Sequence, residues 1–160
     1  MNKLIFTIIF SFIFFQSFSQ NWSQYQKIVA SDRDASDNFG ESISISGSYA
    51  IAGAPFEDND SLGSTYVANS GSAYIFERNP NGDWMQVQKL TAFVRDTAAA
   101  FGLVVSINNK YAIVGAKNED FNASGLNEES NAGAAYIFER DNNGNWNQAQ
   151  KIVASDRSVG

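Results

Sequence analysis

The amino-acid sequence predicts an all-β protein made of β-propeller blades, and three observations support this prediction. First, tryptophans recur at equal spacing as Trp22, Trp84 and Trp146, which reveals an internal repeat. Second, each repeat alternates short apolar stretches with polar turns, as successive antiparallel strands do. Third, no window shows the 3.6-residue apolar period of an amphipathic helix. A four-stranded antiparallel unit of about this length is typical of one propeller blade.

Two complete copies of the unit follow one another. Residues 39–92 and 101–154 align without gaps, with 27 identities in 54 positions. The hexapeptide AYIFER at 73–78 recurs unchanged at 135–140. Identity at this level means that the two copies share one structure, so we expect one blade at 39–92 and a second at 101–154.

Each blade is predicted to contain four strands. In the first copy these are residues 41–46, 49–54, 73–78 and 84–90, and their equivalents in the second copy are 103–108, 111–116, 135–140 and 146–152. Asn81-Gly82 and Asn143-Gly144 mark the hairpin between the last two strands, because both residue types tolerate positive φ. The second and third strands are joined by long polar loops, residues 55–71 and 117–133.

Large aromatic residues recur in the same register. A four-stranded sheet with two apolar faces cannot bury both by itself, and stacking of blades solves that problem. We therefore predict packing between blades for the recurring aromatics, with stacking of carbohydrate as the alternative for any that are exposed. They are Phe39, Tyr49, Tyr74, Phe76 and Trp84, and their equivalents in the second copy.

The composition excludes several kinds of chemistry. The 160 residues include no histidine and no cysteine. A Ser-His-Asp triad, a cysteine nucleophile, a Cys/His zinc site and a disulfide framework are therefore ruled out. The net charge of −6 argues against a nucleic-acid partner, because phosphates require a basic patch.

Residues 1–19 predict a cleaved secretory signal peptide. Lys3 gives a positive start, residues 4–15 are almost entirely apolar, and Ser17 and Ser19 are small residues at a suitable cleavage site. The apolar run is shorter than the roughly 20 residues of a membrane span. We expect a protein that is secreted or lies at the cell surface or in the periplasm, with no membrane span in the mature chain.

The two copies resemble the FG-GAP repeat, the unit of the β-propeller head of integrin α-subunits and of exported bacterial proteins. Phe-Gly is followed by Gly-Ala-Pro in the first copy, and by Gly-Ala-Lys in the second. The resemblance covers roughly residues 22–160 and implies structural roles for its motif residues. These are Phe39, Gly40, Gly53, Ala54, Pro55 and Trp84, with Phe101, Gly102, Gly115, Ala116 and Trp146 in the second copy.

The calcium loop of integrin-type repeats has no counterpart here. The connections between the two motif elements are Ser46-Gly47-Ser48 and Asn108-Asn109-Lys110, and they hold no carboxylate. Calcium requires six to eight oxygen ligands with acidic residues among them. We therefore carry over no metal ligand and expect no cofactor.

The long loops hold the acidic residues that are candidates for ligand binding. Asp58 and Asp60 are the weak candidates for a metal site, but a solvated acidic loop explains them better. The preceding cluster of Asp32, Asp34 and Asp37 is predicted to be a turn, because the second copy keeps only one of its acids. The full set of loop candidates is Glu57, Asp58, Asp60, Glu119, Asp120, Glu128 and Glu129.

Other recurring charges are given structural interpretations. Lys27, Lys89 and Lys151 lie on the predicted fourth strand, where we expect them to protect an exposed sheet edge. Glu77 and Glu139 each precede an arginine, and ion pairing explains them. Residues 141–145 superficially resemble a calcium loop but fit a hairpin better.

The function predicted from this pattern is a non-enzymatic module that binds a protein or glycan at the cell surface. Loops on a rigid scaffold commonly carry recognition, and the two long loops differ most between the copies. One alternative is a structural spacer or surface-coat element. The other is a part of a polysaccharide hydrolase, acting through paired carboxylates, whose catalytic residues lie outside this chain.

The flanks of the two copies predict an incomplete propeller. Residues 20–38 hold the equivalent of a lone outer strand and a linker, and residues 155–160 the start of a third repeat. The octapeptide QKIVASDR stands at 26–33 and again at 150–157. Closed propellers need about four to eight blades. We therefore expect either a fragment of a longer protein, completed by further blades, or a chain that associates with itself.

Overall fold

The computed structural model describes residues 22–126 and 129–156, and all regular structure there is β-sheet. No helix in the described part of the chain is long and apolar enough to cross a membrane. Two four-stranded antiparallel sheets follow one another, each a meander in chain order. This confirms the two predicted blades. Sheet 1 contains β1 (Ile43–Ser46), β2 (Tyr49–Ala54), β3 (Ser72–Arg78) and β4 (Trp84–Leu90). Sheet 2 contains β5 (Phe101–Ile107), β6 (Tyr111–Ala116), β7 (Ala134–Arg140) and β8 (Trp146–Ile152).

The turns form where glycine and asparagine allow them. The turn from β1 to β2 uses Gly47 at φ +58°, and the β3–β4 and β7–β8 hairpins use Gly82 at +96° and Gly144 at +93°. The register shifts between Ile75 and Phe76 in sheet 1 and at the same place in sheet 2. The two copies therefore share the position of this register shift as well as their strands.

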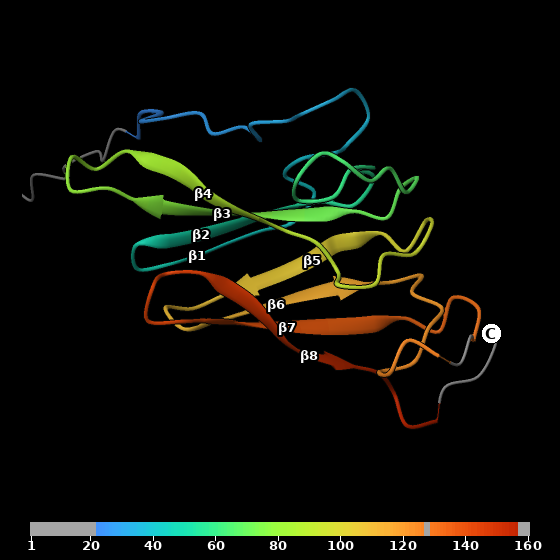
Figure 1. Ribbon diagram of the computed structural model, residues 1–160. Coiled ribbons are helices and arrows are strands. Elements are labelled where there is room, and N and C mark those ends of the chain that lie inside the picture. Colours follow the sequence, from blue (N-terminus) through green and yellow to red (C-terminus); the bar gives the residue numbers. More distant parts are fainter. Residues whose placement is uncertain (1–21, 127–128, 157–160) are drawn as a thin grey trace, which may run out of the picture.

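The two sheets are stacked, with the lower face of sheet 1, as drawn in Figure 1, on the upper face of sheet 2. One core cluster contains residues of both facing surfaces, including Ile51 and Ile75 from sheet 1 and Phe138 from sheet 2. The rings of Tyr49 and Trp146 meet edge to face across this interface, with centroids 5.7 Å apart. Stacking thus buries Tyr49 and four aromatics of the second copy, as predicted for packing between blades. The prediction is wrong for the others: Phe39, Tyr74, Phe76 and Trp84 pack in the cluster on the opposite face of sheet 1, and Tyr111 is 41% exposed.

A close approach of two glycines fixes the distance between the sheets. A Cβ atom placed on Gly53 would lie 1.8 Å from the carbonyl oxygen of Gly102, which no side chain allows. Gly102 in turn has φ +95°, and a Cβ there would lie 2.3 Å from the carbonyl oxygen of Ser72. The Phe-Gly of the second copy therefore rests directly on the Gly-Ala-Pro of the first.

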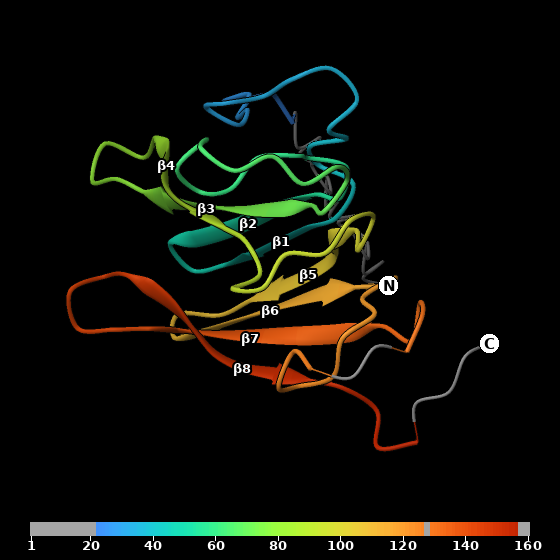
Figure 2. The same ribbon diagram turned by 45° about the vertical axis from the view of Figure 1, so that its right-hand side comes forward.

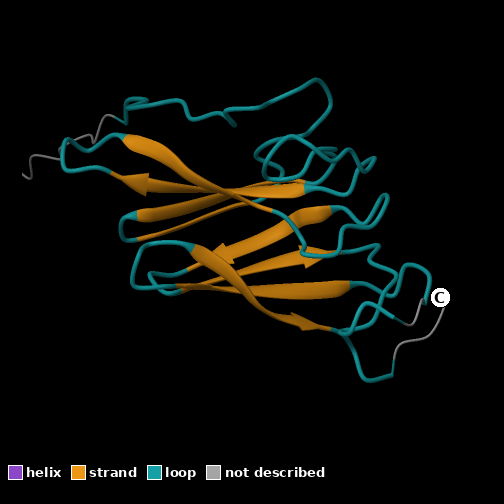
Figure 3. Ribbon diagram, viewed as in Figure 1, coloured by secondary structure: helices purple, strands orange, loops and turns teal. Residues whose placement is uncertain are grey.

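The long loops and the tight turns lie at opposite ends of the stack. The loop 55–71, the described parts of the loop 117–133 and the linker 91–100 gather at the right-hand end in Figure 1, and Figure 2 shows the same stack turned by 45°. The two-residue turns and the hairpins face the other way, and Figure 3 shows that only strands and loops are present among the described residues. The predicted contact loops thus share one end of the molecule.

Residues 22–33, the N-terminal segment, form no strand, so the predicted lone outer strand is wrong. The segment crosses above sheet 1 (Figure 1), with Ala30 buried in the cluster on that face. A glutamine side chain of this segment, and not its main chain, forms the hydrogen bonds with the main chain of β4. The Gln26 side chain donates to the Trp84 carbonyl at 2.9 Å and accepts from the Trp84 amide at 2.8 Å. The predicted signal peptide lies outside the described residues, as do residues 157–160.

Candidate functional site

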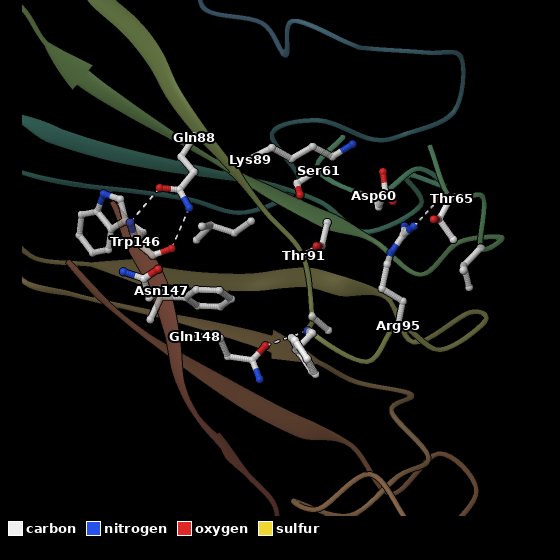
Figure 4. A pocket seen from close by; sticks show the side chains of 15 residues that line it. Asp60, Ser61, Thr65, Gln88, Lys89, Thr91, Arg95, Trp146, Asn147 and Gln148 are labelled. Carbon is white, nitrogen blue, oxygen red and sulfur yellow. Dashed lines mark hydrogen bonds between the residues drawn. The ribbon is translucent and has the colours of Figure 1, made fainter. Parts of the chain in front are cut away.

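A groove of about 520 Å³ opens between the outer strands β4 and β8 and the loop after β2 (Figure 4). We call it the loop-end groove. Its wall combines charged, amide and aromatic side chains, a mixture that suits a polar ligand with an apolar face. The residues that line it include Asp60, Lys89, Phe93, Arg95, Asn147 and Gln148.

Glutamine side chains hold the two walls of the groove together. Gln88 on β4 donates to the Trp146 carbonyl at 2.7 Å and accepts from the Trp146 amide at 2.8 Å. Gln148 on β8 accepts from the amide of Phe93 at 2.9 Å. Gln26 and Gln86, their equivalents one repeat earlier, make the same two contacts between the N-terminal segment and sheet 1. The glutamines thus join each unit to the next.

Arg95 connects the linker to the loop after β2. Its guanidinium donates to the Thr65 carbonyl at 2.9 Å and to the Ser70 hydroxyl, and it lies 3.9 Å from the carboxylate of Glu57. Burial lowers the pKa of Arg95, and the neighbouring carboxylates only partly offset this. The residue therefore places a partly desolvated positive charge beside the groove.

The predicted acidic ligands of the loops are used by the loops themselves. Asp60 accepts hydrogen bonds from the amides of Leu62 and Ser64, at 3.0 and 2.8 Å, and these bonds hold the pKa of Asp60 well below its usual range. Asp58 accepts from the Asn69 amide at 2.6 Å, and Asp120 accepts from the Asn131 amide at 2.5 Å. Among the described residues, no group of three acidic side chains is placed to hold a metal ion.

Glu57 and Glu119 are buried rather than solvated, so the prediction of a solvated loop is wrong for both. Glu57 pairs with Lys89 at 2.8 Å, and Glu119 pairs with Lys151 at 2.6 Å. Neither lysine lies at an exposed edge as predicted, since each side chain is more than nine-tenths buried. Each ammonium also lies over a tyrosine ring, 5.6 Å from Tyr74 for Lys89 and 5.5 Å from Tyr136 for Lys151.

The acidic cluster before the first copy is partly tied to this ion pair. Asp32 accepts from Lys89 at 2.7 Å, while Asp37 accepts from the Asp34 amide at 2.6 Å. Burial raises the pKa of Asp37, assisted by nearby carboxylates. Val94 stands at the position of Asp32 in the second copy, so the two ion pairs have different surroundings.

The remaining predicted residues make other contacts. Glu129 donates its amide to the Asp120 carbonyl at 2.7 Å, and Glu128 lies outside the described residues. Glu77 accepts from the Tyr49 hydroxyl, and Glu139 pairs with Lys110 at 2.9 Å. The expected ion pairing is therefore confirmed for Glu139, with Lys110 as its partner, whereas Glu77 forms a hydrogen bond with a tyrosine. Residues 141–145 form the β7–β8 hairpin.

Sequence reasoning missed Phe93, Arg95, Asn147 and Gln148 as groove residues. The repeated glutamines of the outer strands are evident in the sequence. Their contacts with the next unit become apparent only once the sheets are stacked. Phe93 carried a signal, because it replaces the Ser31 of the preceding repeat with an aromatic residue in a polar linker. A single aromatic residue that departs from a repeat is a reasonable marker of a site.

Stacked four-stranded sheets, related by an internal repeat and joined through facing glycines, define a β-propeller repeat module. A model of the FG-GAP repeat matches residues 22–76 and 84–138, more than half of the chain. The chain therefore belongs to the FG-GAP repeat family. Each match begins at a tryptophan and ends within the third strand of the following sheet, so it spans the junction between two units. A search of curated proteins found no matching sequence.

Proposed function

We propose that this protein is an exported, non-enzymatic module that binds a glycan or a protein at the cell surface through the loop-end groove. The observation that carries the proposal is the groove itself, where Arg95, Asn147 and Gln148 surround a cavity of about 520 Å³ beside the exposed ring of Phe93. The predicted signal peptide supports export, and the family resemblance supports a binding role.

The chemistry of the groove favours a glycan. Phe93 is 89% exposed, although its main-chain amide is held by Gln148. A ring presented in this way offers an apolar surface to the C–H face of a sugar. The side-chain amides of Asn147 and Gln148, which line the groove, are suitable partners for sugar hydroxyls.

The use of the carboxylates favours binding without turnover. Glu57 is committed to Lys89, and Asp60 accepts three hydrogen bonds within its own loop. A glycosidase needs two carboxyl groups facing one glycosidic bond, with one of them available as an acid. These two side chains instead stabilise the scaffold around the groove.

A glycan array followed by calorimetry with the best oligosaccharide tests the proposal. Phe93→Ala is expected to weaken binding about tenfold, which corresponds to the loss of roughly 1.4 kcal/mol of stacking. Leu126→Ala is the matched control, because Leu126 is also highly exposed but lies outside the groove. Unchanged affinity of the Phe93 variant would show that the groove is not the binding site.

A further inference from the structure

A second, smaller pocket of about 160 Å³ lies beside Lys151, and Phe93 and Gln148 line both this pocket and the loop-end groove. We call it the Lys151 pocket. We propose that it binds the carboxylate of an acidic sugar, a uronic acid, within the glycan that the groove takes up. This assignment rests on the proposed function and names the class of glycan.

The Lys151 pocket has an equivalent in the first copy of the repeat. A pocket of about 330 Å³ there is lined by residues 61–63 of the loop after β2 and by Lys89. The Lys151 pocket is lined by residues 123–125 of the loop after β6, which are their equivalents, and by Lys151. The two pockets are therefore one feature of the repeat, and the contacts in the first show what the second is shaped to hold.

In the first copy the chain itself places a carboxylate in this pocket. Asp32 lines the pocket and accepts a hydrogen bond from the Lys89 ammonium at 2.7 Å. The same ammonium pairs with the buried Glu57 carboxylate at 2.8 Å. An ammonium has three N–H donors, so it holds both acids at once. The repeat thus provides one buried lysine for two carboxylates.

In the second copy the carboxylate that lines the pocket is absent. Val94 stands at the position of Asp32 and lines the Lys151 pocket, but its side chain accepts no hydrogen bond. Lys151 keeps its pair with Glu119 at 2.6 Å, and among the described residues no second carboxylate pairs with it. The Lys151 side chain is only 7% exposed. A carboxylate that enters the pocket would therefore meet an ammonium largely shielded from water, where a charge-assisted hydrogen bond is stronger than at the surface.

A neighbouring difference between the copies indicates that this carboxylate belongs to a sugar. Phe93 stands where the first copy has Ser31, directly before the position of Val94. One difference adds an exposed aromatic ring to the wall of the pocket, and the other removes the internal carboxylate. A uronic acid carries its carboxylate directly on the pyranose ring. A sugar stacked on Phe93 would thus present its acid to Lys151.

Calorimetry on the purified chain tests the proposal with trimers of galacturonic acid and of mannuronic acid, their methyl esters, and sodium acetate. At least one acid trimer is expected to bind about tenfold more tightly than its ester, because the ester has no charge to pair with Lys151. The same trimer is expected to bind more tightly than acetate, which has no ring for Phe93.

Two results would overturn the proposal. If neither acid trimer binds more tightly than its ester, Lys151 recognises no carboxylate. If acetate binds as tightly as the trimers, the site takes a free acid and not a sugar. The proposed function is judged separately by Phe93→Ala, which should weaken the binding of acid and ester alike. Esters that bind as well as acids, with both weakened by Phe93→Ala, would leave the groove a glycan site without this specificity.

A valine variant tests the pocket itself. Val94→Asp returns the carboxylate of the first copy to the Lys151 pocket, where it competes with the ligand. It is expected to abolish the preference for acid over ester, with circular dichroism confirming the fold. Val104→Asp is the matched control, because Val104 is also exposed and lines neither the groove nor the pocket. It adds the same charge and should keep the preference. A preference that persists in Val94→Asp, or that is lost equally in Val104→Asp, would overturn the proposal.

Discussion

Lys89 shows why the charges of this fold were harder to predict than its strands. The residue pairs with Tyr74 in the β3–β4 register and therefore faces the side of sheet 1 that the N-terminal segment covers. A repeated lysine on an outer strand looks like edge protection in the sequence. Glu57 reaches the Lys89 ammonium only because the loop after β2 folds back toward β4. The sequence pattern does not reveal that path of the loop.

Lys89→Met should destabilise the protein by about 3–5 kcal/mol, because it leaves the buried Glu57 carboxylate without its nearest cation. Urea unfolding followed by circular dichroism measures the change. The double variant Glu57→Gln/Lys89→Met should recover part of the loss, since the buried carboxylate is then removed together with its lysine, and only part because Arg95 loses its nearby carboxylate. A double variant no more stable than the single one would contradict this account.

The acidic groups near Lys89 predict a pH dependence of stability. Burial acts to raise the pKa of Asp32, but the contacts with Lys89 and Tyr74 together outweigh it, so the pKa of Asp32 is lowered. A lowered pKa contributes stability above the unfolded value of about 3.9, and this contribution is lost as the pH falls. Burial raises the pKa of Asp37, which has the opposite effect.

Asp32→Asn should therefore reduce stability at pH 7 but not near pH 2. The measurement is the free energy of unfolding of both proteins across this range. Asp34→Asn is the control, because Asp34 lies in the same turn without contacting Lys89. A difference between Asp32→Asn and the wild type that is constant with pH would exclude the ion pair as its cause.

Strands were the most predictable elements of the chain. β2 and β4 and their equivalents β6 and β8 have the predicted bounds, because alternating apolar residues and the Asn-Gly hairpins fix them locally. The first strand is shorter in sheet 1 than in sheet 2, since β5 continues to Phe101 where it bridges to Gly71. The N-terminal segment has the sequence of an outer strand, but among the described residues no third strand lies beside it for pairing.

The equivalent tryptophans Trp84 and Trp146, at the start of the outer strands, are expected to contribute unequally to stability. Trp146 is 2% exposed between the sheets, whereas Trp84 is only partly buried beneath the N-terminal segment. Trp146→Ala should cost about 3–5 kcal/mol, and Trp84→Ala should cost clearly less. Chemical unfolding of both variants provides the comparison. Equal losses would mean that the N-terminal segment covers Trp84 as completely as sheet 1 covers Trp146.

The loops after β2 and β6 predict almost no effect of calcium on stability. Asp58, Asp60 and Asp120 already accept hydrogen bonds from main-chain amides of their own loops. Calcium would have to displace these bonds, so we expect the melting temperature to change by less than about 2 °C between chelator and millimolar calcium. A shift of many degrees would assign a calcium site to these loops.

At the scale of the whole molecule, stacking of the blades followed from the sequence, but the groove did not. Repeated apolar faces require a partner, and the next copy along the chain is the nearest one. The loop-end groove depends on how far β4 and β8 diverge and on where the linker places Phe93 and Arg95. These features differ between the copies, so the repeat gives no guide to them.

The facing glycines predict that the two sheets unfold as one cooperative unit. Gly53→Ala would place a methyl group 1.8 Å from the Gly102 carbonyl oxygen, so the sheets must separate or distort. We expect a loss of about 3 kcal/mol, the upper end of typical overpacking costs. Because one core cluster spans both sheets, unfolding should remain a single transition at lower denaturant concentration. Gly115→Ala, the same change at the equivalent position, should leave the stability of the monomer within about 0.5 kcal/mol. If Gly53→Ala were equally harmless, or if it split unfolding into two transitions, the glycine contact would not be what joins the sheets.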